Sequence, residues 1–305
     1  MDWSARLDKQ MADYLPDVNL LKEEPMAKHT SFRVGGPAKR MAFPEKREQL
    51  VLLLSMAEEC GARPLVIGNG TNLLAPDEGL DRLVIETGGL SRLDFGEEPD
   101  SLVAESGVSL ARLADFACKQ GLKGLEFAHG IPGTVGGGVC MNAGAYGGEL
   151  KQVVTGVSAL FPEDGVKFLT GEELAFGYRR SFLTEHPEAV VLYAAFRLSP
   201  GEPEAIRETM RDLLARRKAS QPLEQPSAGS TFKRPEGHFA GTLIDRCGLK
   251  GRAVGGAQVS EKHAGFVINR GGATCADIKE LIRQVREIVL EKTGVRLEPE
   301  VKFVS

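Results

Sequence analysis

The chain has 305 residues, of which 42% are hydrophobic and 26% charged, so it can supply a packed core and is not expected to be disordered. Its formal net charge is −4, and no long basic stripe is present, which argues against nucleic acid as the main partner. Glycine is in excess at 36 residues, but the Gly-X-Y repeat of collagen is absent.

The N-terminus lacks an apolar signal core, and the longest aliphatic run, Leu50–Leu54, is too short to span a bilayer. The five cysteines are an odd number and form no CxxC pair, so reduced and mostly buried thiols are expected. Scattered His and Cys residues show no ligand spacing, and no metal site is predicted. These features predict a soluble cytoplasmic protein without membrane insertion.

The first two thirds of the chain mix strands with a few helices. One helix is predicted at 46–60, with Gly61 as its stop, and another at 110–120, after the cap Ser109. Strands are expected at 64–67, 82–87, 102–105, 153–161, 166–169 and 190–198. The turn 162–165 (PEDG) joins two of them as a hairpin, and the pattern favours an α+β region up to about residue 200.

The composition changes at the turn-rich segment 199–203 (SPGEP), which predicts a domain boundary. A charged helix at 204–219 follows, and two more helices are predicted at 239–247 and 277–292, the latter with Thr274 as a candidate cap. Strands are expected at 265–269 and 295–304. The chain is therefore predicted to form two α+β domains.

Three glycine-rich segments expose backbone N–H groups of the kind that bind anionic phosphate. They are 31–38 (SFRVGGPA), 67–74 (IGNGTNLL) and 126–148 (EFAHGIPGTVGGGVCMNAGAYGG). None is followed by the GK[ST] of an ATPase loop, and none is a Rossmann GxGxxG that opens a helix. Their order along the chain favours a different kind of nucleotide site.

Seven motifs resemble those of the UDP-N-acetylenolpyruvoylglucosamine reductase family. They are KHTSFRVGGPA (28–38), GNGTNLL (68–74), FAHGIPGTVGG (127–137), MNAGAYGGE (141–149), FGYRRSFL (176–183), AGSTFKRP (228–235) and LEPEVKF (297–303). The resemblance implies an enzyme with noncovalent FAD that uses NADPH to reduce UDP-N-acetylglucosamine enolpyruvate to UDP-N-acetylmuramate. That reaction belongs to cytoplasmic peptidoglycan precursor synthesis.

The same resemblance implies the fold and its division. Residues 1–202 would form an FAD-binding region of the PCMH/vanillyl-alcohol-oxidase-like type, with α+β subdomains at about 1–87 and 88–202. Residues 203–305 would form a smaller substrate-binding domain, whose last strand, about 297–305, packs back on the FAD-binding region. A monomer is expected.

For catalysis, the resemblance places Arg179 at the substrate carboxylate, Ser230 as proton donor and Glu300 beside the enolate. On chemistry alone, Arg180 competes with Arg179, because either guanidinium can pair with a carboxylate. Lys218, Tyr178 and His263 are expected in the substrate site.

The residues expected at FAD share the glycine-rich segments. They are Arg33, Gly35, Gly36, Gly68, Asn69, Gly70, Thr71, Asn72, Leu73, Gly130, Ile131, Pro132, Gly133, Val135, Gly136, Gly137, Asn142, Gly144, Ala145 and Tyr146.

The sequence departs from one branch of the family in the loop that closes over the bound substrate. One branch of the family has an inserted loop with a tyrosine, whereas here only residues 180–190 separate GYRRS from the next strand. The chain is expected to belong to the compact branch, and Tyr178 does not take the role of the missing tyrosine. Two other functions stay open: a flavin oxidase or dehydrogenase acting on an alcohol or hydroxy acid, and a nonenzymatic nucleotide-sugar binding protein.

Overall fold

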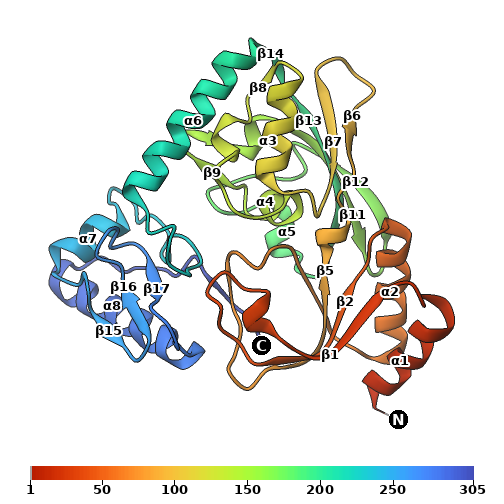
Figure 1. Ribbon diagram of the computed structural model, residues 1–305, viewed down its shortest axis with the longest axis horizontal. Coiled ribbons are helices and arrows are strands. Elements are labelled where there is room, and N and C mark those ends of the chain that lie inside the picture. Colours follow the sequence, from red (N-terminus) through yellow and green to blue (C-terminus); the bar gives the residue numbers. More distant parts are fainter. Residues whose placement is uncertain (1) are drawn as a thin grey trace. The chain divides into compact units, whose positions relative to one another are not determined.

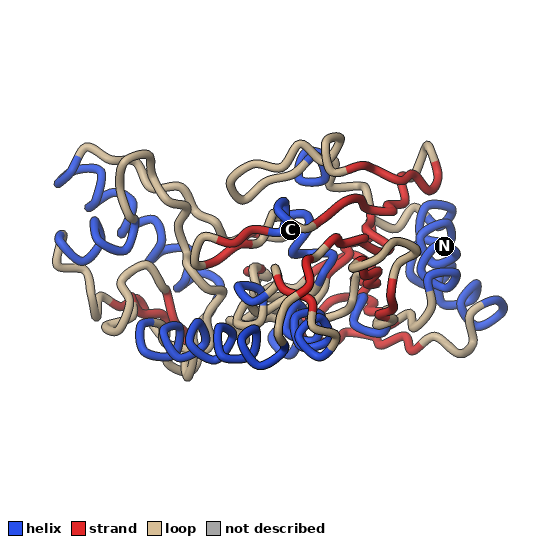
Figure 2. The backbone as a smooth tube through the Cα atoms, turned by 90° about the horizontal axis from the view of Figure 1, so that it is seen from above, coloured by secondary structure: helices blue, strands red, loops and turns tan. Residues whose placement is uncertain are grey.

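The structure, a computed structural model, describes residues 2–305 (Figure 1). Its contacts divide the chain into two compact units, each assembled from separate stretches of sequence. Unit 1 comprises residues 2–22, 40–69 and 82–216, and unit 2 comprises residues 23–39, 70–81 and 217–305. Both units contain helices and strands, so the predicted α+β class is confirmed. Figure 2 colours the helices blue and the strands red.

Unit 1 holds most of the strands. Its helices are α1 (Trp3–Tyr14), α2 (Arg47–Cys60), α3 (Leu110–Lys119), α4 (Val135–Cys140) and α5 (Phe182–Glu185), with the 3-10 turns η2 (Thr87–Gly89), η3 (Glu126–Ala128) and η4 (Leu150–Gln152). Its strands are β3 (Pro64–Ile67), β6 (Leu93–Phe95), β7 (Ser101–Glu105), β8 (Leu122–Lys123), β9 (Gly144–Ala145), β10 (Gly148–Glu149), β11 (Val154–Phe161), β12 (Gly165–Thr170), β13 (Val190–Arg197) and β14 (Ser199–Pro200). Four of the five unit boundaries fall inside an element, namely β1 (Asn19–Pro25), β2 (Pro37–Phe43), β5 (Leu80–Glu86) and α6 (Pro203–Ser220).

The core of unit 1 has two parts. In one, α1 packs on α2, and Leu7, Leu50 and Ile85 are fully buried beside the parallel pair β3 and β5. That pair belongs to a sheet with the order β1-β2-β5-β3. In the other part, the antiparallel sheet β12-β11-β13-β7-β6 packs with α3 and α4 around residues such as Leu113 and Phe196. Both parts bury apolar side chains, which is the main driving force for folding.

Most predicted elements of this region are confirmed. Helix α2 ends at Gly61, which is left-handed with φ 69°, and α3 begins after Ser109, whose hydroxyl accepts from the N–H of Arg112 at 3.1 Å. The hairpin of β11 and β12 is also present, with Phe161 opposite Gly165.

Three helices of unit 1 were not predicted: α1, α4 and the four-residue α5. Helix α1 lies in the segment that was considered only for a signal sequence. Helix α4 contains three consecutive glycines, which local propensity disfavours. It forms because close packing favours residues without a side chain: a Cβ at Gly136 would come within 3.0 Å of Ser106, and one at Gly138 within 3.1 Å of Leu150.

Unit 2 is built on one long helix. Its elements are η1 (Met26–Lys28), β4 (Leu73–Leu74), α7 (Ala240–Arg246), β15 (Ala253–Val254), β16 (Ala257–Val259), β17 (Val267–Asn269), α8 (Cys275–Thr293) and β18 (Lys302–Phe303). The sheet β15-β16-β17 and α7 pack on α8 around Ile244, Ile278 and Val285. The predicted cap is confirmed, because the Thr274 hydroxyl accepts from the N–H of Asp277 at 3.0 Å.

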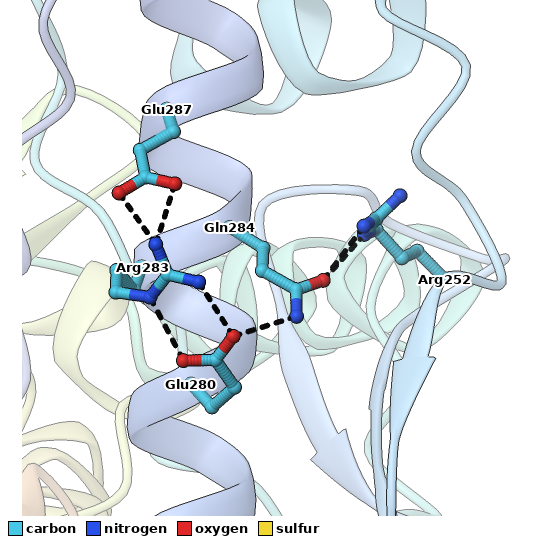
Figure 3. A network of polar contacts seen from close by, with 5 residues as sticks. All are labelled: Arg252, Glu280, Arg283, Gln284 and Glu287. Atoms are coloured by element: carbon cyan, nitrogen blue, oxygen red, sulfur yellow. Dashed lines mark hydrogen bonds and ion pairs between the residues drawn. The ribbon is translucent and has the colours of Figure 1, made fainter.

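A chain of charged and polar side chains lies along the solvent side of α8 (Figure 3). The guanidinium of Arg283 donates to Glu280 through Nε and to Glu287 through Nη1. The Gln284 amide donates to Glu280 and accepts from Arg252. These i,i+3 and i,i+4 pairs lie on the exposed face of the helix, where water screens them, so each supports the helix only weakly.

The predicted terminal strand at 295–304 is wrong in its extent. Only β18 (Lys302–Phe303) is a strand, and it pairs in parallel with β4 (Leu73–Leu74). Upstream, Pro299 forms an isolated bridge with Phe232. Since proline has no N–H, it cannot contribute a donor to a regular ladder at this point. The predicted strand at 265–269 is likewise shorter, because β17 begins at Val267.

All five cysteines are free thiols, and four of them are buried, as expected. Among the helices that residues 2–305 form, none has the length and apolar character needed to cross a bilayer.

Candidate active site

Two glycine-rich segments of unit 1 meet where β3 ends and α4 begins. A Cβ at Gly68 would overlap the Thr134 hydroxyl, so glycine is needed for this approach. The N–H of Gly136 donates to the carbonyl of Ser106 at 2.9 Å, which fixes the first turn of α4. Gly137 is exposed, and a Cβ there would approach only Thr134, at 3.9 Å. The first turn of α4 therefore presents bare backbone on one side.

A tight hairpin follows α4. Its strands β9 and β10 pair Gly144 with Glu149 and Ala145 with Gly148, so Tyr146 and Gly147 form a two-residue turn. Both turn residues have positive φ, 53° and 86°, as the favoured hairpin turns require. The turn leaves the Tyr146 side chain exposed at the tip.

The two candidate arginines differ in their surroundings. Arg179 is half-buried, and its Nη2 donates to the carbonyl of Gly144 at 3.1 Å. Its guanidinium carbon lies 5.3 Å from the centre of the Tyr178 ring. Arg180 is exposed, and its guanidinium is 3.9 Å from the exposed carboxylate of Glu185. A surface pair of this kind contributes little to stability, so Arg179 is held by the protein more firmly than Arg180.

In unit 2, the segments around Arg33 and Gly70 pack on each other. A Cβ at Gly70 would overlap the carbonyl oxygen of His29, and one at Gly36 would overlap that of Asp77. The N–H of Ser31 donates to the carbonyl of Gly70 at 3.2 Å. These glycines are therefore required by packing within the protein, whatever ligand the segments bind. Arg33 is exposed and left-handed, with φ 55°.

The segments of Ser230 and Glu300 lie side by side in unit 2. The N–H of Glu300 donates to the carbonyl of Thr231 at 2.8 Å, and the carbonyl of Glu300 accepts from the Asn72 side chain at 3.1 Å. Ser230 is exposed, whereas its neighbour Thr231 is fully buried, with its hydroxyl accepting from the N–H of Val267 at 2.9 Å. Thr231 thus holds the turn that presents the Ser230 hydroxyl to solvent.

His263 belongs to the same neighbourhood. Its Nδ1 accepts from the N–H of Gly265 at 3.1 Å, and the carbonyl of Gly265 accepts from the N–H of Thr231 at 2.8 Å. Burial lowers the pKa of His263, and the charge of Lys250 lowers it further, against an opposing backbone hydrogen bond. The neutral ring with its proton on Nε2 is therefore favoured.

Lys218 lies on the last turn of α6 and is exposed. Its carbonyl accepts from the ammonium of Lys262 at 2.7 Å. A second cation thus lies next to a residue that was expected in the substrate site.

Strained backbone is concentrated at the predicted site residues. Seven residues other than glycine have positive φ in the described chain, and four of them are predicted site residues: Arg33, Asn142, Tyr146 and Arg179. Such conformations cost about 1–3 kcal/mol each and cluster at functional sites.

The structure brings the predicted residues together in two groups. Within unit 1 it gathers the segments of Gly68, Gly136 and Gly144 with Arg179, and within unit 2 it gathers Asn72, Ser230, His263 and Glu300. Sequence reasoning missed the residues that support them, namely Thr134, Ser181 and Thr231. All three stand in quoted motifs, next to candidate site residues, and this is the signal that could have found them.

Comparisons with known proteins identify the family. The model of an FAD binding domain matches residues 38–168. The model of the C-terminal domain of UDP-N-acetylenolpyruvoylglucosamine reductase matches residues 221–304. The reductase of Agathobacter rectalis is 48% identical over 97% of this chain and 98% of its own length. This chain belongs to the UDP-N-acetylenolpyruvoylglucosamine reductase family.

Further relatives cover the same length. The reductase of Caldanaerobacter subterraneus subsp. tengcongensis is 45% identical over 97% of both chains. The crystal structure of UDP-N-acetylenolpyruvylglucosamine reductase from Thermus caldophilus superposes with a TM-score of 0.79 at 36% identity, over 94% of this chain and 99% of that one. The fold is therefore an FAD-binding region of the PCMH type followed by the C-terminal domain of this reductase family.

The residues present fit a dinucleotide such as FAD. Its pyrophosphate is bound well by bare backbone N–H groups, and the open side of Gly137 offers such backbone. Asn142 and Tyr146, which have strained left-handed backbone, lie in the glycine-rich segment just after α4.

Proposed function

We propose that this chain is the NADPH-dependent flavoenzyme that reduces UDP-N-acetylglucosamine enolpyruvate to UDP-N-acetylmuramate. The proposal is carried by one observation: a match to an FAD binding domain and a match to the C-terminal domain of this reductase family stand in one chain, which aligns over 97% of its length with a reductase. NADPH as hydride donor and a cytoplasmic place in peptidoglycan precursor synthesis are parts of the proposal, and they follow from the family.

FAD would be held by the glycine-rich segments around residues 33–36, 68–73 and 130–146. When bound, it accepts hydride from NADPH and supplies hydride to the terminal enol-ether carbon of the substrate. The protein then has to orient the substrate, stabilise the charge that develops and deliver a proton.

Arg179 is the group that we assign to the substrate carboxylate. Negative charge accumulates next to that carboxylate as hydride arrives, and a fixed cation stabilises it. The guanidinium is already ordered by the Gly144 carbonyl and by the left-handed backbone of Arg179. Little reorganisation is then needed when the substrate binds.

Ser230 is the group that we assign to protonation of the neighbouring carbon. Its hydroxyl is exposed on a turn that buried Thr231 holds, and that turn is tied to the Glu300 segment. A hydroxyl is a weak acid, so Glu300 and a cation such as Lys218 are assigned to its polarisation. His263, Tyr178 and Lys218 are assigned to substrate binding.

Three finer points belong to the same proposal. The segment between Arg180 and Val190 contains only the short helix α5 and no tyrosine, which supports the compact branch of the family. Residues 1–202 are assigned to FAD binding, with subdomains at about 1–87 and 88–202, and 203–305 to substrate binding. The active form is proposed to be a monomer.

Anaerobic flavin spectroscopy tests the function. The purified protein is expected to be yellow, to bleach with NADPH and to regain colour only when the enolpyruvyl substrate is added. Bleaching by an alcohol or hydroxy acid without NADPH would favour the oxidase alternative instead. A colourless protein that binds UDP-sugars would favour the nonenzymatic alternative.

The Ser230→Ala variant tests the role of that hydroxyl. NADPH should bleach the flavin at nearly the wild-type rate, while reoxidation by substrate slows by roughly 100-fold or more, the usual range for losing a general acid. Equal loss in both half-reactions would remove Ser230 from the proton-donor role.

A further inference from the structure

Two buried polar side chains fix the loop that carries Tyr178 and Arg179. At one end, the Ser181 hydroxyl donates to the carbonyl of Cys140 at 2.9 Å. At the other end, the Asn142 amide donates to the carbonyl of Gly177 at 3.0 Å. Ser181 and Asn142 are each only 1% exposed. Both ends of the loop are therefore fastened to residues 140–142, at the C-terminal end of α4.

The side chain of Asn142 is fully engaged by the protein. Its second amide N–H donates to the Glu149 carboxylate at 2.8 Å, and its oxygen accepts from the N–H of Lys151 at 2.9 Å. The orientation of the amide follows from these partners, because a flipped amide would set its oxygen against two acceptors. Its three hydrogen bonds leave little capacity for a ligand.

The same short segment also holds the head of Arg179. The guanidinium donates to the carbonyl of Gly144, two residues after Asn142, at 3.1 Å. Arg179 and Asn142 both have left-handed backbone, with φ 55° and 42°. Asn142 thus fastens the base of the loop, and its own segment receives the tip of the arginine side chain.

We propose that Asn142 is a positioning residue for Arg179, with Ser181 holding the other end of the loop. The inference rests on the proposed function, in which Arg179 meets the substrate carboxylate. Under this proposal the side-chain amide of Asn142 serves Arg179 rather than FAD, since each of its polar atoms has a protein partner. Asn142 acts on the substrate through Arg179 alone.

Two substitutions separate hydrogen bonding from backbone strain. Asn142→Asp keeps the shape and the acceptor for Lys151, but it loses both donors and sets a carboxylate against Glu149. Asn142→Gly removes the side chain and tolerates the left-handed backbone. Arg180→Gln is the matched control, because it changes the neighbouring exposed arginine and none of these bonds.

Both Asn142 variants should retain FAD, with an unchanged visible spectrum, and should be reduced by NADPH at close to the wild-type rate. Reoxidation by the enolpyruvyl substrate should fall on the order of 100-fold, the scale of a misplaced catalytic group. Binding of UDP-N-acetylmuramate, measured by calorimetry, should weaken in the same variants. Arg180→Gln should match the wild type in all three measurements.

The decisive comparison uses Arg179→Ala as the background. If Asn142 acts through Arg179, adding Asn142→Asp to Arg179→Ala should slow reoxidation by no more than about twofold, since residues that act as a unit are not additive. A full, additive loss in the double variant would overturn the inference. So would wild-type reoxidation in Asn142→Asp.

Two further results complete the test. If the Asn142 variants do not fold, Ser181→Ala releases the other end of the loop, and its effect must likewise vanish in the Arg179→Ala background. An additive effect there overturns the proposal. Failure of the proposed function would look different, because the wild-type protein itself would then not be reoxidised by the enolpyruvyl substrate.

Discussion

The N–H of Glu300 donates a hydrogen bond to the carbonyl of Thr231 at 2.8 Å, and so joins two segments that are 69 residues apart. The Thr231 hydroxyl at the same time accepts from the N–H of Val267. One buried threonine therefore connects the turn of Ser230, the strand β17 and the segment of Glu300. This relationship places a candidate proton donor and a candidate carboxylate in one locally ordered structure.

Thr231→Val should destabilise this part of the protein. The variant keeps the shape but leaves the buried N–H of Val267 without its acceptor, which costs about 1–3 kcal/mol of unfolding free energy. Urea unfolding followed by circular dichroism measures the loss. Thr231→Ser keeps the hydroxyl and is the matched control, so a valine variant more stable than the serine variant would contradict the assigned role.

Arg179→Lys and Arg180→Lys should behave differently. Lysine keeps the charge at position 179 but loses the planar fork that fits a carboxylate. We expect reoxidation of the reduced flavin by substrate to slow roughly 100-fold in Arg179→Lys, at the lower end of the range for an electrostatic donor lost from the transition state. Arg180→Lys should leave the stopped-flow rate unchanged, and the reverse pattern would assign the carboxylate to Arg180.

His263 should make the stability of the protein depend on pH. Burial, the largest cause, holds its pKa below the ordinary value of about 6.5. Below that ordinary value the unfolded chain binds a proton that the folded chain does not, so acidification favours unfolding. Above the ordinary pKa, His263 is neutral in both states and the protein keeps its full unfolding free energy. Part of that free energy is lost as the pH falls toward the lower pKa that His263 has in the folded protein.

The measurement compares the wild type with His263→Gln in urea titrations from about pH 7.5 to about pH 5.5, on either side of the histidine pKa. The wild type should lose more unfolding free energy than the variant over this range. Equal losses would show that His263 titrates normally in the folded protein.

Gly70 and Gly294 form a matched pair of left-handed glycines, with φ 57° and 71°. A Cβ at Gly294 meets nothing within 4 Å, so Gly294→Ala should cost only the conformational term of about 1–2 kcal/mol. A Cβ at Gly70 overlaps the carbonyl of His29, so Gly70→Ala should cost about 1–3 kcal/mol more. If Gly70→Ala and Gly294→Ala had equal unfolding free energies in urea, the close packing of the Gly70 segment on the His29 segment would be contradicted.

Helix ends and hairpin turns were predictable from the sequence, because residues close to each other in the chain determine them. Ser109, Gly61 and Thr274 mark helix ends, because each satisfies or terminates a helix within a few residues of itself. The hairpin at 162–165 was predictable for the same reason. The glycine-rich segments and both candidate arginines could also be found from their motifs.

Contacts between distant residues could not be predicted. The glycines of α4 form a helix only because Ser106 and Leu150 pack on them, and Asn142 reaches Gly177 across 35 residues. The Asn72 side chain binds the carbonyl of Glu300 across 228 residues. No periodicity or capping rule encodes such pairs, so the supporting residues of the site became visible only in the structure.

The most direct test of the proposed activity is an anaerobic single turnover of the wild-type enzyme. Flavin reduced by NADPH is mixed with UDP-N-acetylglucosamine enolpyruvate in a stopped-flow instrument, and the product is identified by mass spectrometry. We predict that the flavin colour returns as the substrate gains two hydrogen atoms and becomes UDP-N-acetylmuramate. Flavin that stays reduced until oxygen is admitted, with the substrate unchanged, would contradict the account.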